Sequence, residues 1–237
     1  MQKREQLYEG KAKILYTTDD PDLLVMYFKD DATAFNKKKV GQWDGKGMVN
    51  CRISTVMLGA LARAGVESHL VEKLSDREQL VRRVHIIPVE VVVRNVVAGS
   101  LARRLGMPEG RRLSKPFVEW YYKSDSLDDP MILDQWILEF GWATAAELEL
   151  MRSSALEVNR VVGGFFEGLD IDLIDFKIEF GRDSSGRVLL ADEVTPDGSR
   201  LWERGTGRKL DKDRFRYDLG DVQGTYEELL RRVEAAS

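Results

Sequence analysis

The segment IDFKIEF, residues 174–180, alternates apolar and charged side chains with a strict period of two. Successive side chains of a β-strand point to opposite faces, so the pattern predicts a strand with one buried face. The apolar face would be formed by Ile174, Phe176, Ile178 and Phe180. The charged face would present Asp175, Lys177 and Glu179. Any fold of this chain must therefore accommodate an acid, a base and a second acid along one strand.

The residues that follow predict a hairpin, because RDSSG at 182–186 is a turn sequence and VLLADEV is a second strand. With a loop of about six residues, Gly181–Gly186, the antiparallel register places Asp192 on the face of Asp175 and Lys177. Carboxylates on neighbouring strands suit a Mg²⁺ ion that also binds phosphate oxygens. The alternative is an ordinary solvent-exposed sheet face, which shows the same alternation.

The rest of the chain mixes strand and helix patterns, which predicts the α+β class. Strands are predicted at 6–18 (two strands joined at Gly10), 23–30 and 66–74, and helices at 47–65, 144–168 and 221–236. Thr144 and Glu147 have the spacing of a capping box at the start of the second helix. Pro88 divides the apolar segment 80–100. Since proline donates no hydrogen bond, this segment is predicted to cross between two lobes there.

Composition excludes several functional classes. The single cysteine, Cys51, cannot form an internal disulfide, and with only His69 and His85 the chain lacks the ligands of a usual zinc site. A net charge of -4 argues against general nucleic-acid binding. No apolar run approaches the roughly 20 residues that span a bilayer, and the N-terminus does not resemble a signal peptide. We expect a cytoplasmic protein that binds neither nucleic acid nor membranes.

Two segments are candidate phosphate sites. In YEGKAK, Gly10 allows backbone amides to approach an anion, and Lys11 and Lys13 project from the same face. An exposed hairpin without a ligand is the alternative, and the segment alone favours it. In RNVVAGSL, a strand that carries Arg94 turns into a helix expected to begin at Ser100, so both side chains and free helix amides can meet one phosphate. A plain helix cap with a surface arginine is the alternative.

The segment DEVTPDGSRLW, residues 192–202, is richer in charge than a turn requires. Asp192 is predicted to be a metal ligand that pairs across the hairpin with Glu179. DGSR at 197–200 offers a second Ser-Arg pair, Ser199 and Arg200, which suits a phosphate or a carboxylate. Alternation places Glu193 on the opposite face, where structural pairing is the expected role.

Over essentially its whole length the chain resembles SAICAR synthetases, the phosphoribosylaminoimidazole-succinocarboxamide synthases of purine biosynthesis. The motifs that carry the resemblance, in order, are YEGKAK, GKGMVN, IPVEVVVRN, AGSL, DDPM, DFKIEFG, DEVTPDGSRLW and DKDRFR. The resemblance implies a two-lobed α+β fold with ATP in the cleft. Residues 1–88 would form an N-terminal antiparallel lobe like the nucleotide-binding lobe of kinases and ATP-grasp enzymes, and 89–237 a larger substrate- and metal-binding lobe.

The implied reaction is the ATP-dependent joining of L-aspartate to the carboxylate of carboxyaminoimidazole ribonucleotide (CAIR), most simply through an acyl phosphate. The partners would be these small molecules and Mg²⁺, and the enzyme would be a homo-oligomer, expected as a dimer.

Two alternatives fit the same ATP site: a small-molecule or lipid kinase, and a nucleotide-sensing module without turnover. The chain lacks the His-Arg-Asp catalytic loop of kinases, which argues against the first alternative. A module that only binds nucleotide would have no use for metal carboxylates beside Lys177, which argues against the second.

The resemblance also implies residue roles. The phosphate-covering hairpin would be Gly10, Lys11, Ala12 and Lys13. The backbone that reads adenine would lie around Val81, Val84 and Ile86. The Mg²⁺ carboxylates would be Glu179 and Asp192. The ribonucleotide phosphate would be held by Arg94, Ser100 and Arg200. Catalytic positions would be Lys177, Asp175 and Lys123, of which Lys123 would also contact ATP. Other substrate positions would be Asp129, Asp175, Asp197, Ser199 and Lys212. The chain departs from the family pattern at Lys37, Ala191 and Thr195.

Overall fold

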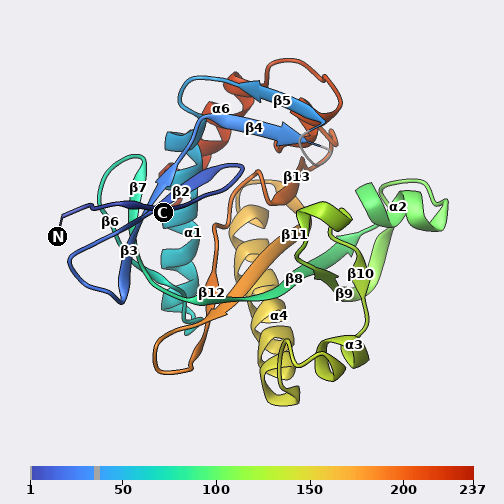
Figure 1. Ribbon diagram of the computed structural model, residues 1–237. Helices are drawn as coiled ribbons and strands as arrows, with labels where there is room; N and C mark the ends of the chain where they lie inside the picture. The colour runs from blue at the N-terminus through green and yellow to red at the C-terminus, as the bar shows by residue number, and fades with distance from the viewer. Residues whose placement is uncertain (1, 35–37) are drawn as a thin grey trace.

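The first sheet forms from the N-terminal strands that the alternating patterns predict. The computed structural model describes residues 2–34 and 38–237, and Figure 1 shows this sheet in blue and blue-green beside helix α1. Its strands all pair antiparallel. In spatial order they are β1 (Gln6–Glu9), β2 (Lys13–Thr17), β3 (Leu23–Phe28), β7 (Glu78–Arg82) and β6 (Leu70–Lys73).

The second sheet is also antiparallel and contains the charged strand predicted first, β11 (Ile171–Arg182). β11 pairs with β8 (His85–Val96) along one edge. Along the other edge it pairs with β12 (Val188–Ala191) near its C-terminal end and with β13 (Ser199–Glu203) near its start. β9 (Arg112–Tyr122) and β10 (Met131–Ile132) extend the sheet beyond β8. The polar side chains of β11 thus meet residues from strands on both sides.

Three long helices pack against these sheets, and all three were predicted: α1 (Lys46–Arg63), α4 (Ala145–Glu167) and α6 (Val222–Ala235). α4 packs on the second sheet, and α1 contacts the first sheet as well as α4 and α6 (Figure 1). Thr144 and Glu147 form the expected capping box. The C-terminal helix therefore returns to the N-terminal half of the molecule.

A continuous apolar core joins the helices to the second sheet. Ile53 of α1, Val158 of α4 and Phe180 of β11 are all fully buried in it. A smaller cluster between the first sheet and α1 contains Cys51, a free thiol whose pKa burial raises to about 12. The antiparallel sheets with packed helices confirm the predicted α+β class.

Several short elements complete the fold, and sequence patterns predicted only one of them, α2. They are β4 (Asp31–Ala34), β5 (Lys39–Gln42), α2 (Gly99–Leu105), the 3₁₀ turn η1 (Asp125–Leu127), α3 (Asp134–Glu139) and α5 (Asp213–Arg216). α2 begins at Gly99, one residue before the predicted start. β4 and β5 form a separate hairpin over α6 (Figure 1).

Pro88 lies inside strand β8, so the predicted crossing at this residue is wrong. The break falls at residues 83–84, between β7 and β8. The β8–β11 register shifts between Glu179 and Gly181, opposite the stretch that contains Pro88, and the ladder with β9 begins only at Val89. A bulge of this kind tolerates a residue without a backbone donor.

The alternation predicted for residues 174–180 of β11 fails at Ile174. Ile174 packs in a small cluster with Val96 and Ala98, whereas Phe176 belongs to the main core. The β11–β13 register shifts between Leu173 and Asp175, and such a bulge changes which face the following side chains occupy. The predicted loop is also wrong, because the hairpin loop spans residues 183–187 and not Gly181–Gly186.

Within residues 2–34 and 38–237, no helix has the length and apolar character needed to cross a bilayer.

Candidate active site

A cluster of lysines and carboxylates surrounds the middle of β11. The Nζ atom of Lys177 lies 2.6 Å from Glu179 Oε1 and 3.1 Å from Asp192 Oδ2. Glu90 of β8 lies 3.4 Å from the same nitrogen, and Lys123 lies 3.3 Å from Glu179. The structure therefore brings together Lys177, Lys123, Glu179 and Asp192, as predicted.

This face of the sheet is not an exposed polar surface, so that alternative interpretation is wrong. Asp175 is 3% exposed and Glu179 is 5% exposed. Burial opposes ionisation of Glu179, but the charges of Lys177 and Lys123 outweigh it and lower its pKa to about 2. Burial likewise opposes the charge on Lys177, and Glu179 and Glu90 outweigh it, so its pKa is raised. The cluster holds its ionised form through mutual pairing.

Asp192 reaches the cluster by a route that differs from the predicted register. Glu179 pairs directly with Ala191, so a continued strand would place Asp192 opposite Ile178, on the apolar face. Strand β12 instead ends at Ala191, and Asp192 has a left-handed φ of 69°. Aspartate tolerates this conformation better than most residues. The turned backbone directs the carboxylate to Lys177.

Glu193 belongs to the same cluster, and the prediction that it lies on the opposite face is wrong. Lys13 forms ion pairs with both Asp192 and Glu193. Burial opposes ionisation of Glu193, but Lys13 outweighs it and lowers the pKa to about 2. Alternation failed here because the strand had already ended at Ala191.

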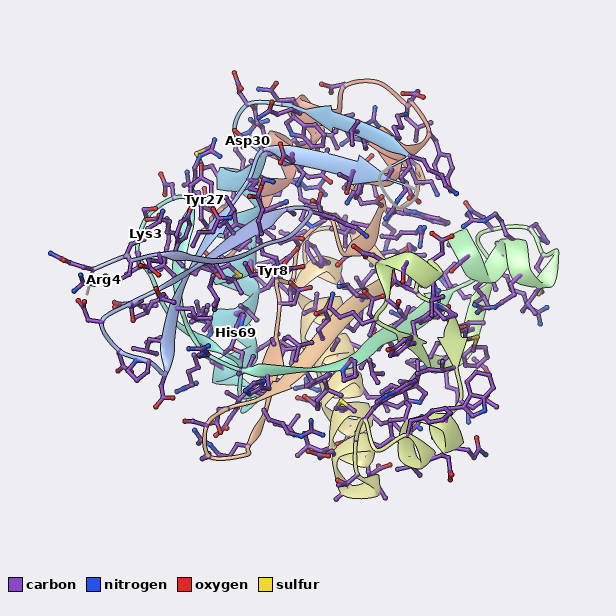
Figure 2. The ribbon with its side chains drawn as sticks, viewed as in Figure 1. Lys3, Arg4, Tyr8, Tyr27, Asp30 and His69 are labelled. Carbon is purple, nitrogen blue, oxygen red and sulfur yellow. The ribbon has the colours of Figure 1, made fainter. Side chains whose placement is uncertain are left out.

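The β1–β2 hairpin lies against this cluster through Lys13. Besides the pairs of Lys13, Lys11 Nζ lies 2.8 Å from Asp125, at the start of η1. At the tip, the Gly10 amide donates to the Lys13 carbonyl at 2.8 Å, and the Ala12 carbonyl accepts from Lys29. Figure 2 labels Tyr8, whose ring lies beside Gly10. The hairpin thus bridges the first sheet and the polar end of the second.

A cavity of about 340 Å³ adjoins the cluster. It is large enough for a small ligand and is lined mainly by polar side chains. Its lining includes the predicted residues Arg94, Ser100, Asp175, Lys177, Asp197, Ser199 and Arg200. Other lining residues, which were not predicted, are Glu90, Val92, Arg103, Tyr121, Phe176, Gly198, Arg216 and Tyr217.

Arg94 is held at the base of this cavity by several partners. Its guanidinium donates to Asp175 at 2.7 Å, to Glu119 at 3.0 Å and to the Ser100 hydroxyl at 2.8 Å. Arg94 is 3% exposed. The first amide of α2, that of Gly99, donates to Glu109 at 2.8 Å. The predicted meeting of Arg94 and Ser100 is confirmed, although this amide is occupied within the protein.

Arg200 approaches the same place from β13. Its Nη1 lies 3.0 Å from Asp175 Oδ2, and its Nε donates to Asp213 at 2.8 Å. A methyl group at Gly99 would overlap the Arg200 guanidinium, so the glycine permits this approach. Gly99 also has a φ of 53°, a value that favours glycine. Asp175 therefore joins the two arginines predicted to bind one anion.

Asp197 sits at another side of the cavity in a buried ionic cluster. It forms an ion pair with Lys46 of α1 and accepts a 2.8 Å hydrogen bond from Tyr226 of α6. Lys212 lies 4.0 Å from the same carboxylate, and burial lowers the pKa of Lys212 to about 8. Ser199 is 5% exposed and lines the cavity.

The residues expected to contact adenine differ in their burial and in their position relative to the strands. Val81 is buried inside β7 with its backbone paired on both sides, Val84 lies between β7 and β8, and Ile86 is 40% exposed in β8. Asp129 accepts the Ser124 amide at 2.8 Å. Lys37 lies outside the described residues.

The family model of SAICAR synthetase matches residues 6–233. The chain is 56% identical to the phosphoribosylaminoimidazole-succinocarboxamide synthase of Magnetococcus marinus, over 98% of this chain and 97% of the relative. The chain belongs to the SAICAR synthetase family. It is therefore a ligase of purine biosynthesis, as the motifs indicated.

Solved SAICAR synthetases share the fold. The crystal structure of the Ehrlichia chaffeensis synthase matches with a TM-score of 0.95 at 41% identity, over 98% of this chain and 99% of that one. A SAICAR synthetase (Type-2) in complex with ADP matches with a TM-score of 0.92 at 43% identity, over 95% and 96% of the two chains. The two-lobed fold expected for a SAICAR synthetase is confirmed.

Several partners of the predicted SAICAR synthetase residues were missed. Glu90 lies two and four residues before Val92 and Arg94 in IPVEVVVRN, so the period of two could have placed it on the face of Arg94. Lys46 and Tyr226 carry no such signal, because each belongs to a helix and meets Asp197 only through tertiary packing.

Two carboxylates of the cluster are candidate ligands for Mg²⁺. Within the described ranges no group of three or more His, Cys, Asp or Glu side chains forms a complete metal cage. Glu179 and Asp192 nevertheless converge on one cation, the Lys177 ammonium. Mg²⁺ in phosphate-binding sites commonly uses one or two carboxylates, with water and phosphate oxygens completing its shell. Two convergent carboxylates fit that kind of site.

Proposed function

We propose that this enzyme joins the amine of L-aspartate to the carboxylate of CAIR with the conversion of ATP to ADP and phosphate, giving SAICAR. The carboxylate would first attack the γ-phosphorus of ATP to form an acyl phosphate and release ADP. The aspartate amine would then attack the acyl carbon, lose a proton and expel phosphate. Atoms and charge balance over the two steps.

The single observation that carries this proposal is the position of Lys177. Its side chain lines the arginine-rich cavity, while its ammonium group contacts Glu179 and Asp192. A phosphoryl group that passes from ATP to a substrate carboxylate needs a cation where the two sites adjoin. Lys177 supplies a positive charge at that junction.

The lysine and carboxylate cluster is proposed as the ATP end. Lys11, Lys13 and the hairpin around Gly10 and Ala12 would cover the phosphates, and Lys123 would contact them from β9's C-terminal side. Glu179 and Asp192 would hold Mg²⁺, which when bound neutralises charge on phosphate oxygens. Adenine would lie near the backbone of Val81, Val84 and Ile86. The nucleotide and substrate lobes, predicted as 1–88 and 89–237, are proposed to meet at the break between β7 and β8, at residues 83–84.

The arginine-lined cavity is proposed as the CAIR site. Arg94, Ser100 and Arg200 would bind the ribonucleotide phosphate, and in its absence Asp175 supplies the negative charge between the two arginines. Asp129, Asp197, Ser199 and Lys212 would contact the remaining polar groups. Positioning and charge stabilisation would supply most of the catalysis, because phosphoryl transfer needs little covalent help from protein groups.

The test is an assay of phosphate release by the purified protein with ATP, Mg²⁺ and CAIR, run with and without L-aspartate. We expect release that depends on aspartate and matches the amount of SAICAR formed. Release that does not require aspartate, or no release at all, would overturn the proposal.

The cytoplasmic location and the homodimer remain predictions. Cell fractionation tests the location, and sedimentation tests the oligomeric state.

A further inference from the structure

We propose that Arg103, Arg216 and Tyr217 form a binding site for a carboxylate of the amine substrate. We call these three residues the outer wall of the cavity. The inference rests on the proposed function and adds to it the place where the second substrate is held. It follows from an inventory of the hydrogen-bond donors that face the cavity.

The cations at the base of the cavity have protein partners for most of their donors. Arg94 uses Nε, Nη1 and Nη2 in bonds to two carboxylates and two hydroxyls. Arg200 uses Nε for Asp213 and Nη1 for Asp175. A guanidinium has five N–H donors, so Arg94 retains little capacity for a further ligand unless Asp175 is displaced, whereas Arg200 keeps its Nη2 donors for the proposed phosphate.

The arginines of the outer wall have fewer protein partners than Arg94 at the base of the cavity. Arg103 has one side-chain hydrogen bond, from Nη1 to the Tyr217 hydroxyl at 3.3 Å, and forms no ion pair within residues 2–34 and 38–237. Among the side chains that the structure describes, Arg216 is bound only by Asp213, which lies 2.7 Å from its Nη1. Both guanidiniums therefore keep donors for a bidentate carboxylate.

The two arginines come from separate elements that converge on the cavity. Arg103 lies in the last turn of α2 and is exposed, whereas Arg216 ends α5. The contact from Arg103 to Tyr217 joins these elements, and all three residues line the same cavity. The anion site would thus be assembled across the cavity rather than on one helix.

The charge of the cavity favours an anionic ligand in addition to the ribonucleotide phosphate. Its cationic lining side chains are Arg94, Arg103, Lys177, Arg200 and Arg216. Its carboxylates are Glu90, Asp175 and Asp197. Positive charge is in excess, and Arg103 is the cation that lacks a carboxylate partner among the described residues. Arg94, Ser100 and Arg200 are already proposed for the phosphate, and Lys177 lies where the carboxylate of CAIR is expected to react, so the carboxylates of aspartate are the remaining anions.

The geometry also suits the second chemical step. Lys177 lies on the wall that adjoins the ATP cluster, and the outer wall belongs to the same cavity. An amino acid held by its carboxylate at Arg103 and Arg216 would have its amine directed into the cavity, where the acyl group of the activated ribonucleotide is expected. The fork of an arginine fixes both the position and the orientation of such a carboxylate.

The experiment measures steady-state kinetics for Arg103→Gln, Arg103→Lys and Tyr217→Phe. Loss of a charge-assisted hydrogen-bond pair should raise KM for L-aspartate on the order of 10- to 100-fold in Arg103→Gln, with KM for CAIR changed less than about 3-fold. Arg103→Lys should recover part of the loss because it keeps the charge without the fork. Tyr217→Phe should give a smaller rise. Arg160→Gln, an exposed arginine on α4 that pairs only with Glu157, is the matched control.

Succinate provides a direct binding readout, because it carries both carboxylates but no amine. Its inhibition constant against aspartate should rise in Arg103→Gln by about the same factor as KM for aspartate. A purely structural role for Arg103 would instead change KM for both substrates, or kcat alone, and would overturn the inference. A rise confined to KM for CAIR would show that the outer wall binds the phosphate, which also overturns it. If the wild-type enzyme makes SAICAR and Arg103→Gln is unchanged, the inference fails while the proposed function stands.

Discussion

The ammonium group of Lys177 lies 2.6 Å from the carboxylate of Glu179, two residues further along the same strand. Both side chains are on the polar face of β11, and the pair is joined by Asp192 from the turn that follows β12. The arrangement places a cation between two carboxylates beside the substrate cavity. Exchange of these partners for phosphate and metal is the central expectation of the proposed mechanism.

Glu179→Gln should lower kcat/KM on the order of 100-fold or more, because the amide cannot provide the negative charge proposed to hold Mg²⁺. Folding should change little, since Lys177 retains Asp192 and Glu90 as partners. The measurements are turnover and the thermal midpoint, with the exposed Glu149→Gln as control. Near-normal turnover in Glu179→Gln would remove this residue from the proposed metal site.

Lys46→Met should destabilise the protein by about 3–5 kcal/mol, because it leaves the buried carboxylate of Asp197 without its closest cation. Lys212, at 4.0 Å, is too distant to replace it fully. Lys3→Met removes a partly exposed ion pair to Glu78 and should cost less than about 1 kcal/mol. Urea unfolding compares the two variants, and equal costs would contradict the buried-pair interpretation.

Gly99→Ala should raise KM for the ribonucleotide about 10-fold, because the new methyl group displaces Arg200. The left-handed backbone should add a stability cost of about 1–2 kcal/mol. Gly106→Ala is the matched control, since Gly106 has a φ of 61° but open space around its Cβ. That variant should lose stability alone. A KM that rises equally in both variants would argue against contact with Arg200.

His69 should make the fold sensitive to acid. The side chain, labelled in Figure 2, is buried, and burial followed by the charge of Lys13 lowers its pKa from 6.5 to about 3. Between pH 3 and 6.5 the unfolded chain therefore binds a proton that the folded chain does not, so stability falls as pH decreases through this window. The effect is up to about 1.4 kcal/mol per pH unit.

The measurement is the free energy of unfolding at pH 7.5 and 5.0 for the wild type and for His69→Gln. The variant should show a smaller difference between the two pH values, because glutamine does not titrate. The same substitution at the exposed His85 serves as control. An unchanged difference in His69→Gln would show that carboxylates alone set the acid sensitivity.

Local patterns predicted much of the fold because they report local physics. The alternation in β11, the capping box of Thr144 and the apolar stripes of α1 and α6 each determine one element without reference to the others. The β4–β5 hairpin was missed, since its strands are short and their pattern is weak. A local pattern does not reveal a β-bulge. The predictions of a lobe crossing at Pro88 and of a shared face for Ile174 and Phe176 were therefore wrong.

The site was predictable where side chains follow one another along a strand and less so where the chain turns. Asp175, Lys177 and Glu179 share a strand face. Asp192 was assigned correctly to the cluster for an incorrect reason, because its left-handed backbone compensates for the different register. Glu193 was misplaced by the same turn. The partners of Asp197 depend on the packing of two helices against a loop.

The hydrogen bond from Tyr226 to Asp197 has a consequence for biosynthesis of the enzyme. Asp197 borders the substrate cavity, whereas Tyr226 belongs to α6, which is translated after all the other helices and strands. A nascent chain to which α6 has not yet been added therefore lacks the hydrogen bond from Tyr226, and this side of the cavity is completed only when α6 packs against it.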